Sequence, residues 1–344
     1  MLKFLNIRNV LIIIFIGFST HAVYAGQKTG DETATLVHRI LLLDAASKDG
    51  TSILVGERGL IFVSRDNNPW QMIQLPIPVT LTAVFLQNKN LGWVVGHDAV
   101  IFRTEDGGET WQQVYAAPEE EAPLLDIWFR NETYGIAIGA YGLYLKTTDG
   151  GSTWTREDMP VTTIKTAGKE TINESHRSDD LAEYYDLHLN AVARSDDGKI
   201  YLVAEAGRIY RSIDQGENWQ QLPSPYIGSL FGVLPLEKNT LLVFGLRGHL
   251  FRSEDAGNTW KKIETHTDRM LTNGTVLHDG KIIIVGMEGT ILLSNDYGNT
   301  FSVAKEVNRN NYSALVEDSN NRLILTGDHG LESYTREELG ISDE

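Results

Sequence analysis

Residues 104–111 read TEDGGETW, and four later stretches repeat the same Ser/Thr-x-Asp-x-Gly-x-x-Trp/Phe pattern. These are TTDGGSTW at 147–154, SIDQGENW at 212–219, SEDAGNTW at 253–260 and SNDYGNTF at 294–301. A degraded copy, SRDNNPW at 64–70, precedes them and has Asn68 in place of the glycine. The aspartates of the six copies are spaced by 40, 43, 65, 41 and 41 residues, which indicates a repeat protein with one insertion.

A Gly-x-x-Gly element lies upstream of each copy, between two short apolar runs. Its clear forms are GERG at 56–59, GAYG at 139–142, GLRG at 245–248 and GMEG at 286–289, with relaxed forms at 96–99 and 204–207. A seventh, GDHG at 327–330, follows the sixth by 41 residues. Seven units are therefore visible.

Each unit is expected to contain four strands. In the second unit they are predicted at 81–86, 92–95, 100–103 and 111–115, from alternating or short fully apolar runs. Four antiparallel strands per repeat of about 40 residues is typical of a propeller blade. The sequence therefore predicts an all-β, seven-bladed β-propeller with Asp-box turns, where the Asp box is the repeated Ser/Thr-x-Asp-x-Gly-x-x-Trp/Phe pattern. Because the seventh unit ends after its third strand, we expect Thr33–Val37 to supply its missing outer strand beside Leu331–Tyr334.

The first residues have the form of a secretory signal. Lys3 and Arg8 precede the apolar stretch 10–18, and Val-Tyr-Ala at 23–25 has the form of a cleavage site. We expect a signal peptide at residues 1–25, cleaved after Ala25, and one propeller domain at 26–344 with an insertion at about 158–185. After cleavage no membrane span is expected, and the predicted location is the periplasm.

The charge and the cysteine content of the chain exclude some classes of partner and of covalent attachment. The formal net charge is −16 and becomes −18 once the signal is removed, because Lys3 and Arg8 leave with it. Nucleic acid is not an expected partner, since binding phosphate backbones requires clustered Lys and Arg. There is no cysteine, so neither a disulfide framework nor a lipid-attachment cysteine is available.

The repeated aspartate is interpreted as structural. One carboxylate per loop falls short of the six to eight oxygens that Ca²⁺ takes, whereas it suits the N–H groups of a tight turn. The aromatic residue that ends each box is expected to pack between sheets. No metal and no cofactor is predicted. The proposed structural set is Asp66, Asp106, Asp149, Asp214, Asp255, Asp296, Trp111, Trp154, Trp219, Trp260 and Phe301.

These boxes resemble the bacterial neuraminidase repeats of sialidase and sortilin-like propellers. More closely, VGHDAVIFRTEDGGETW and GAYGLYLKTTDGGSTW resemble the photosystem II stability/assembly factor-like family, over about residues 36–336. That resemblance implies a non-catalytic factor that binds an assembling membrane-protein complex, here in a non-photosynthetic bacterial member. Sialidases add an Arg-Ile-Pro motif, whereas Arg39-Ile40 is followed by Leu41.

A partner is expected on the end of the ring that carries the Gly-x-x-Gly turns, where mixed charge and an aromatic suit protein recognition. The candidate residues are Arg58, His97, Asp98, Asp126, Tyr141, Asn190, Glu205, Arg247, Glu288, Asp328 and His329. The predicted function is a monomeric, non-enzymatic scaffold for an envelope membrane-protein complex or transporter. The alternative is a glycan-binding or sialidase-like glycoside hydrolase propeller.

Overall fold

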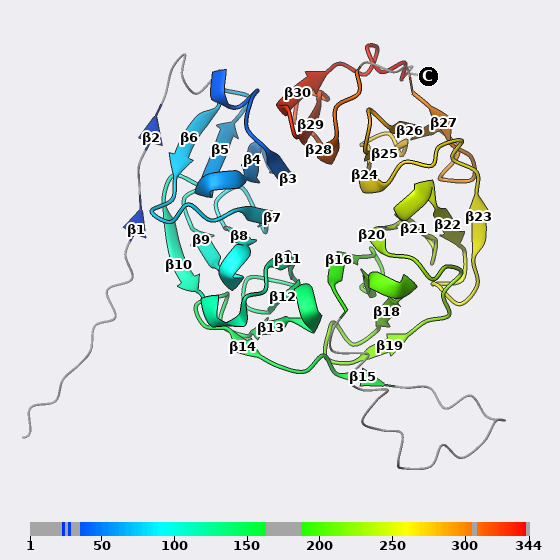
Figure 1. Ribbon diagram of the computed structural model, residues 1–344, viewed down its shortest axis with the longest axis horizontal. Coiled ribbons are helices and arrows are strands. Elements are labelled where there is room, and N and C mark those ends of the chain that lie inside the picture. Colours follow the sequence, from blue (N-terminus) through cyan, green and yellow to red (C-terminus); the bar gives the residue numbers. More distant parts are fainter. Residues whose placement is uncertain (1–22, 25–26, 29–34, 163–186, 305–307, 342–344) are drawn as a thin grey trace, which may run out of the picture.

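The computed structural model describes residues 23–24, 27–28, 35–162, 187–304 and 308–341. These residues form seven sheets around a central axis, each with the first strand of its blade innermost, and all strand pairs are antiparallel except one at the rim of blade four (Figure 1). The predicted seven-bladed β-propeller is therefore confirmed. The signal-peptide prediction, apart from Val23–Tyr24, and the part of the predicted insertion from residue 163 onward lie outside the described residues.

The strands of each blade run in chain order from the axis to the rim. Blade one comprises β3 (Leu42–Lys48), β4 (Thr51–Gly56), β5 (Leu60–Arg65) and β6 (Gln71–Gln74). Blade two comprises β7 (Leu81–Leu86), β8 (Gly92–Gly96), β9 (Ile101–Thr104) and β10 (Trp111–Tyr115). Blade three comprises β11 (Leu124–Phe129), β12 (Gly135–Gly139), β13 (Tyr144–Thr147) and β14 (Thr155–Arg156).

The remaining blades follow the same order. Blade four comprises β16 (Leu189–Arg194), β17 (Ile200–Ala204), β18 (Ile209–Ser212) and β19 (Trp219–Gln221), and blade five comprises β20 (Leu230–Pro235), β21 (Leu241–Gly245), β22 (Leu250–Ser253) and β23 (Lys261–Ile263). Blade six comprises β24 (Leu271–Val276), β25 (Ile282–Gly286), β26 (Ile291–Ser294) and β27 (Ser302–Val303). Blade seven comprises β28 (Tyr312–Glu317), β29 (Leu323–Gly327) and β30 (Gly330–Tyr334). The four strands predicted for the second unit match β7 to β10 to within one residue at each end.

The Asp box joins the third and fourth strands of a blade through a fixed set of hydrogen bonds. In blade two, Asp106 accepts bonds from the hydroxyl of Thr104 (2.8 Å) and from the N–H (2.9 Å) and hydroxyl (2.6 Å) of Thr110. Thr104 in turn accepts the N–H of Gly108 at 2.9 Å. Partial burial opposes ionisation of Asp106, but the bonds from Thr110 and Thr104 together lower its pKa. The carboxylate therefore stabilises the turn to which it belongs.

The Gly-x-x-Gly turn is required by the chain that enters and leaves each blade. A Cβ on Gly56 would lie 2.0 Å from the carbonyl oxygen of Leu41, in the segment that enters blade one. A Cβ on Gly59, whose φ is +66°, would lie 2.4 Å from the carbonyl oxygen of Ile77, in the segment that leaves it. The two glycines thus let both inter-blade linkers pass against the turn.

The core consists of seven apolar clusters, one at each interface between neighbouring blades. Trp111 is fully buried and packs on strands of blade one, and Trp219 is fully buried against blade three. The box aromatic of one blade thus fills the space beside the preceding blade. Each such ring buries a large apolar area, and hence contributes strongly to the interface.

The ring closes differently from the prediction. Of the predicted strand Thr33–Val37, residues 33 and 34 lie outside the described residues, and Thr35 and Leu36 form a helical turn rather than an outer strand. Blade seven has three strands among the described residues. Val37 does contact the expected strand, because its carbonyl accepts the N–H of Leu331 at 2.8 Å, and its buried side chain joins the cluster between blades seven and one. The predicted closing strand is therefore wrong in form, because the chain turns here to enter β3.

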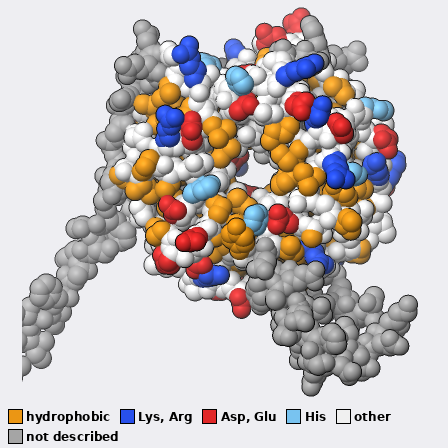
Figure 2. Space-filling model, viewed as in Figure 1, with side chains coloured by type: hydrophobic (Ala, Val, Ile, Leu, Met, Phe, Trp, Pro, Cys, Tyr) orange, Lys and Arg blue, Asp and Glu red, His pale blue; other side chains and the backbone are white. Residues whose placement is uncertain are grey.

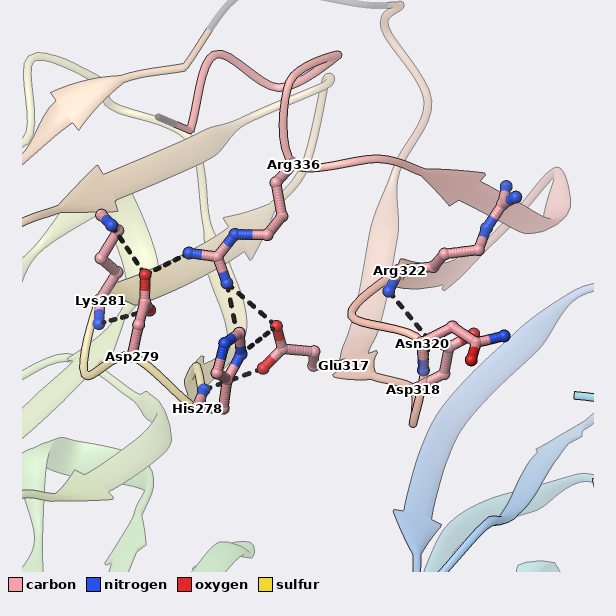
Figure 3. Close-up of polar contacts among 8 residues, drawn as sticks. All are labelled: His278, Asp279, Lys281, Glu317, Asp318, Asn320, Arg322 and Arg336. Carbon is pink, nitrogen blue, oxygen red and sulfur yellow. Dashed lines mark hydrogen bonds and ion pairs between the residues drawn. The ribbon is translucent and has the colours of Figure 1, made fainter. Parts of the chain in front are cut away.

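A C-terminal turn replaces the missing Asp box of blade seven. Leu339 and Ile341 are buried in the cluster between blades six and seven, where other blades place the box aromatic. Arg336 reaches from this turn to Glu317, with 3.1 Å between Nη1 and Oε1, and to Asp279 (Figure 3). Glu317 also accepts the N–H of His278 at 2.9 Å, so the cluster ties blade six to blade seven.

Within the described ranges, three blades gain a fifth strand at the rim, which the sequence did not predict. β2 (Gln27–Lys28) pairs with β6, and β1 (Val23–Tyr24) pairs with β10, both antiparallel. β15 (Val161–Thr162), at the start of the predicted insertion, pairs parallel with β19. Figure 1 shows β1 and β2 lying along the outside of blades two and one. The outer edges of the blades thus accept extended segments.

Candidate functional site

One end of the ring, which we call the turn face, carries the turns between the second and third strands together with the inter-blade linkers. Its turns are residues 57–59, 97–99, 140–142, 205–207, 246–248, 287–289 and 328–329. Figures 1 and 2 look onto this face. The Asp boxes lie at the opposite end, because successive turns of an antiparallel sheet alternate between its two ends.

Six of these turns hold a non-glycine residue in the left-handed region at their tip. They are Arg58 (φ 62°), Asp98 (57°), Tyr141 (54°), Ala206 (53°), Arg247 (57°) and Glu288 (54°). That conformation costs roughly 1 kcal/mol for a residue with a Cβ and persists where the surroundings over-determine it. The ladder on both sides and the adjoining linkers supply that constraint here. Tip side chains are thereby presented at equivalent positions around the ring.

Acidic residues one position before the tips bind the inter-blade linkers. Glu205 accepts the N–H of His188 at 3.1 Å, and Asp328 accepts the N–H of Asn311 at 3.1 Å. Bonds from His329 and Asn311 lower the pKa of Asp328 against the opposing effect of partial burial. Of the predicted binding residues, Glu205 and Asp328 therefore hold linkers in place, while His329 is exposed.

An aromatic sector covers blades three to five of the turn face. Tyr141, with 56% of its surface exposed, meets His188 edge to face with ring centroids 5.0 Å apart. Tyr226 stacks on His249 at 4.3 Å, and its neighbour Ile227 is 92% exposed. An apolar side chain this exposed beside fixed rings is suited to contact with another protein.

Two grooves open on the turn face. One, of about 440 Å³, is lined by polar residues that include Arg247, His249, Lys262 and Asp268. The other, of about 620 Å³, lies between blades one and two and is mainly apolar. Its apolar lining is Ile77, Pro78, Val79, Val100, Ala116 and Pro118. His97 and Asp98 also line it, so three of the predicted residues border a groove when Arg247 of the polar groove is included.

Asp126 and Asn190 lie on the channel wall, where they link blades rather than project into solvent. Asp126 Oδ2 accepts the N–H of Val192 at 2.8 Å, and Asn190 Nδ2 donates to the carbonyl of Leu230 at 2.8 Å. Asp44 makes the equivalent bond to Val84 at 2.8 Å. Each acid sits at a bulge that interrupts its innermost strand. These side chains are therefore already engaged with the neighbouring blade.

Burial raises the pKa of the carboxyl groups of Asp44 and Asp126. Loss of solvent raises the pKa of Asp44 to about 7, and burial together with the nearby Asp44 charge raises that of Asp126 to about 7, against the opposing effect of their backbone hydrogen bonds. Both are thus poised to exchange protons near neutral pH. The sequence analysis named Asp126 but not Asp44, and the raised pKa of both follows from their position on the channel wall.

Charged side chains of both signs lie on the described part of the turn face (Figure 2). Figure 2 shows hydrophobic side chains on several blades, interleaved with acidic, basic and histidine side chains. Among the described residues no cluster of three or more His, Cys, Asp or Glu side chains is arranged to hold a metal ion. Within the same part of the chain, no helix is long and apolar enough to span a membrane.

Residues 62–164 match the model of the photosynthesis system II assembly factor YCF48 family. In sequence and in fold, the chain is similar to the photosystem II assembly factor family. This resemblance, expected from the boxes of blades two and three, is thereby confirmed. The matched residues contain the mainly apolar groove of about 620 Å³ and the tip residues Asp98 and Tyr141.

Two curated relatives match over short segments. The photosystem II assembly protein Ycf48 of Thermosynechococcus vestitus is 43% identical over 47 residues, which is 14% of each chain. The photosystem II assembly lipoprotein Ycf48 of Synechocystis is 47% identical over 47 residues, 13% of this chain and 14% of the relative. The matched segment thus spans about one seventh of these relatives.

Solved structures match over nearly the whole ring. Ycf48 bound to a D1 peptide aligns with a TM-score of 0.66 at 18% identity, covering 87% of this chain and 94% of that one. Virginiamycin B lyase from Staphylococcus aureus aligns with a TM-score of 0.67 at 11% identity, covering 91% and 98%. An assembly factor and a lyase share this architecture, so at these identities the likeness establishes the fold alone.

Sequence reasoning missed the linker residues of the face. His188, Tyr226 and Ile227 lie outside the Gly-x-x-Gly element, so motif spacing did not single them out. The available signal was topological, because the connections between blades share an end of the ring with these turns. An aromatic or large aliphatic residue in a linker was therefore a candidate from the repeat alone.

Proposed function

We propose that the chain is an exported, non-catalytic scaffold that binds a protein of an envelope membrane complex through its turn face. The observation that carries the proposal is the aromatic sector of Tyr141, Tyr226 and Ile227, which exposes apolar surface on a rigid ring. The mixed charge around it favours a protein partner over a polyanion. A protein of the same fold binds a D1 peptide, which is consistent with a peptide or protein ligand.

The periplasm is the proposed location. The first 25 residues have the form of a signal peptide, and curated relatives include a photosystem II assembly lipoprotein. This chain has no cysteine for lipid attachment, so we propose that signal cleavage releases it into that compartment.

Affinity capture tests the proposal. Tagged protein, exported from a Gram-negative host, is incubated with detergent-solubilised envelope, and the captured membrane proteins are identified by mass spectrometry. Tyr141→Ala combined with Ile227→Ala should lose the captured complex. The matched control is Ile213→Ala with Tyr297→Ala, which removes an exposed isoleucine and an exposed tyrosine from the Asp-box end. Equal capture by both double variants would reject the turn face as the binding surface.

The glycan-active alternative draws on one observation, the pair Asp44 and Asp126. Two carboxyl groups with a pKa of about 7 are suited to general acid and base work. Turnover of a 4-methylumbelliferyl sialoside that disappears in Asp126→Asn would favour a hydrolase. Absence of turnover together with envelope capture would favour the scaffold.

A further inference from the structure

The rim of blade two combines a strand edge with an apolar groove. Among the described residues, β1 pairs with the outer side of β10 at Trp111 and Gln112, and no strand lies on that outer side beside Gln113–Tyr115, whose inner side pairs with β9. The groove of about 620 Å³ begins at that end of β10, since Gln113 and Ala116 line it. An extended segment lying antiparallel along β10 would therefore run from the groove toward Trp111.

The chain itself shows that such edges accept added strands. β1, β2 and β15 each add a fifth strand to a blade through backbone pairing. Strand addition draws its affinity from main-chain hydrogen bonds and its specificity from pockets for side chains. Blade two offers both, because the linker residues Ile77 and Val79 line the groove beside the edge.

Cleavage after Ala25 would remove β1 from the outer edge of β10. Val23–Tyr24 precede the expected cleavage site and would leave with the signal, whereas Gln27–Lys28 follow it and would stay on β6. The exported chain would then begin at the rim beside blade one, with the outer edge of β10 open. An unpaired edge of this kind is a template for another strand.

We infer that the outer edge of β10 and its groove form a docking site for an extended, apolar segment of a partner protein, which takes the position held here by Val23–Tyr24. The inference rests on the proposed export and cleavage. It adds a second contact region, on the rim of blade two, to the aromatic sector of the turn face.

The first measurement is the N-terminus of the exported protein by intact-mass spectrometry. A mature chain that begins at Gly26 is expected. A chain that retains Val23–Tyr24 would overturn the docking site, since the edge would stay occupied. Capture of an envelope complex by the turn face would be unaffected by that result, so the two proposals fail separately.

The second measurement uses the mature protein and a synthetic peptide with the sequence of residues 20–25, THAVYA, carrying a polar tail and a fluorophore. Peptide binding should slow hydrogen exchange in Trp111–Tyr115 and leave β23 of blade five unchanged. A peptide with proline in place of Tyr24 should bind about tenfold more weakly, the equivalent of one lost main-chain hydrogen bond. Equal binding of both peptides, or no protection of β10, would overturn the site.

A variant of the groove separates docking from folding. Val79→Asp places a charge in the groove and should weaken the peptide about tenfold, by the scale of one buried apolar contact. The matched control is Val303→Asp on β27, an exposed valine on the rim of blade six. Unchanged thermal midpoints in both variants make a selective loss of binding in Val79→Asp a test of the groove, and equal binding by both would overturn it.

Discussion

The carboxylate of Asp126 accepts the backbone N–H of Val192 at 2.8 Å, so a side chain of blade three holds the innermost strand of blade four. Asp44 holds Val84 of blade two at the same distance. The two acids therefore join blades around the channel while burial raises the pKa of each to about 7. Their protonation is linked to the stability of the ring.

Stability should accordingly fall as the pH rises from about 4 to about 7. A carboxyl whose folded pKa lies above its unfolded value near 3.8 stabilises the protein fully below that value and loses the contribution through the folded pKa. Asp126→Asn should flatten this dependence by on the order of 1–3 kcal/mol between pH 4.5 and 7.5. Urea unfolding at several pH values measures it, and the exposed tip variant Asp98→Asn is the control. An unaltered slope in Asp126→Asn would contradict the prediction.

The C-terminal turn should be as important as an Asp-box aromatic. Leu339 is buried between blades six and seven, so Leu339→Ala should destabilise the protein by about 2–4 kcal/mol. Val303→Ala, at an exposed valine of β27, should change stability by less than about 0.5 kcal/mol. Thermal and denaturant unfolding compare the two. A Leu339→Ala variant as stable as the control would show that blade seven does not need this turn.

The complete and degraded boxes should differ in strength. Asp255 accepts bonds from Ser253 (2.8 Å) and from the N–H (2.8 Å) and hydroxyl (2.6 Å) of Thr259. Among the described residues, none donates a hydrogen bond to the carboxylate of Asp66. Asp255→Ala should therefore cost about 1–2 kcal/mol, and Asp66→Ala less than about 0.5 kcal/mol. Equal losses in chemical unfolding would show that the box aspartates act by something other than these bonds.

A glycine of blade four should be irreplaceable because of its linker. A Cβ on Gly207, at φ +67°, would lie 1.8 Å from the carbonyl oxygen of Tyr226, so the linker would have to move. Gly198 also has a positive φ, of +89°, but the nearest atom to its Cβ would be 3.8 Å away. Gly198→Ala should cost about 1 kcal/mol from backbone strain alone, and Gly207→Ala clearly more. Similar midpoints for the two variants would rule out the linker contact as the cause.

Much of this architecture was predictable because its signals are local. The boxes, the Gly-x-x-Gly turns and the strands of blade two follow from residue types at short, repeated spacings. Tyr141 and Arg247 could be placed on one face for the same reason, since a repeat assigns equivalent positions to equivalent places in each blade. These predictions required no knowledge of which blades touch.

The contacts between blades were beyond that reasoning. The Asp126–Val192 bond joins residues 66 positions apart, and the Arg336–Glu317 pair depends on where the C-terminal turn lies relative to blades six and seven. By itself, the sequence determined the repeat, its strands and the chemistry of its turns. Only the tertiary structure decided how the ring closes, which rim edges gain a strand and which acids have a raised pKa on the channel wall, because these follow from the curvature that brings distant repeats together.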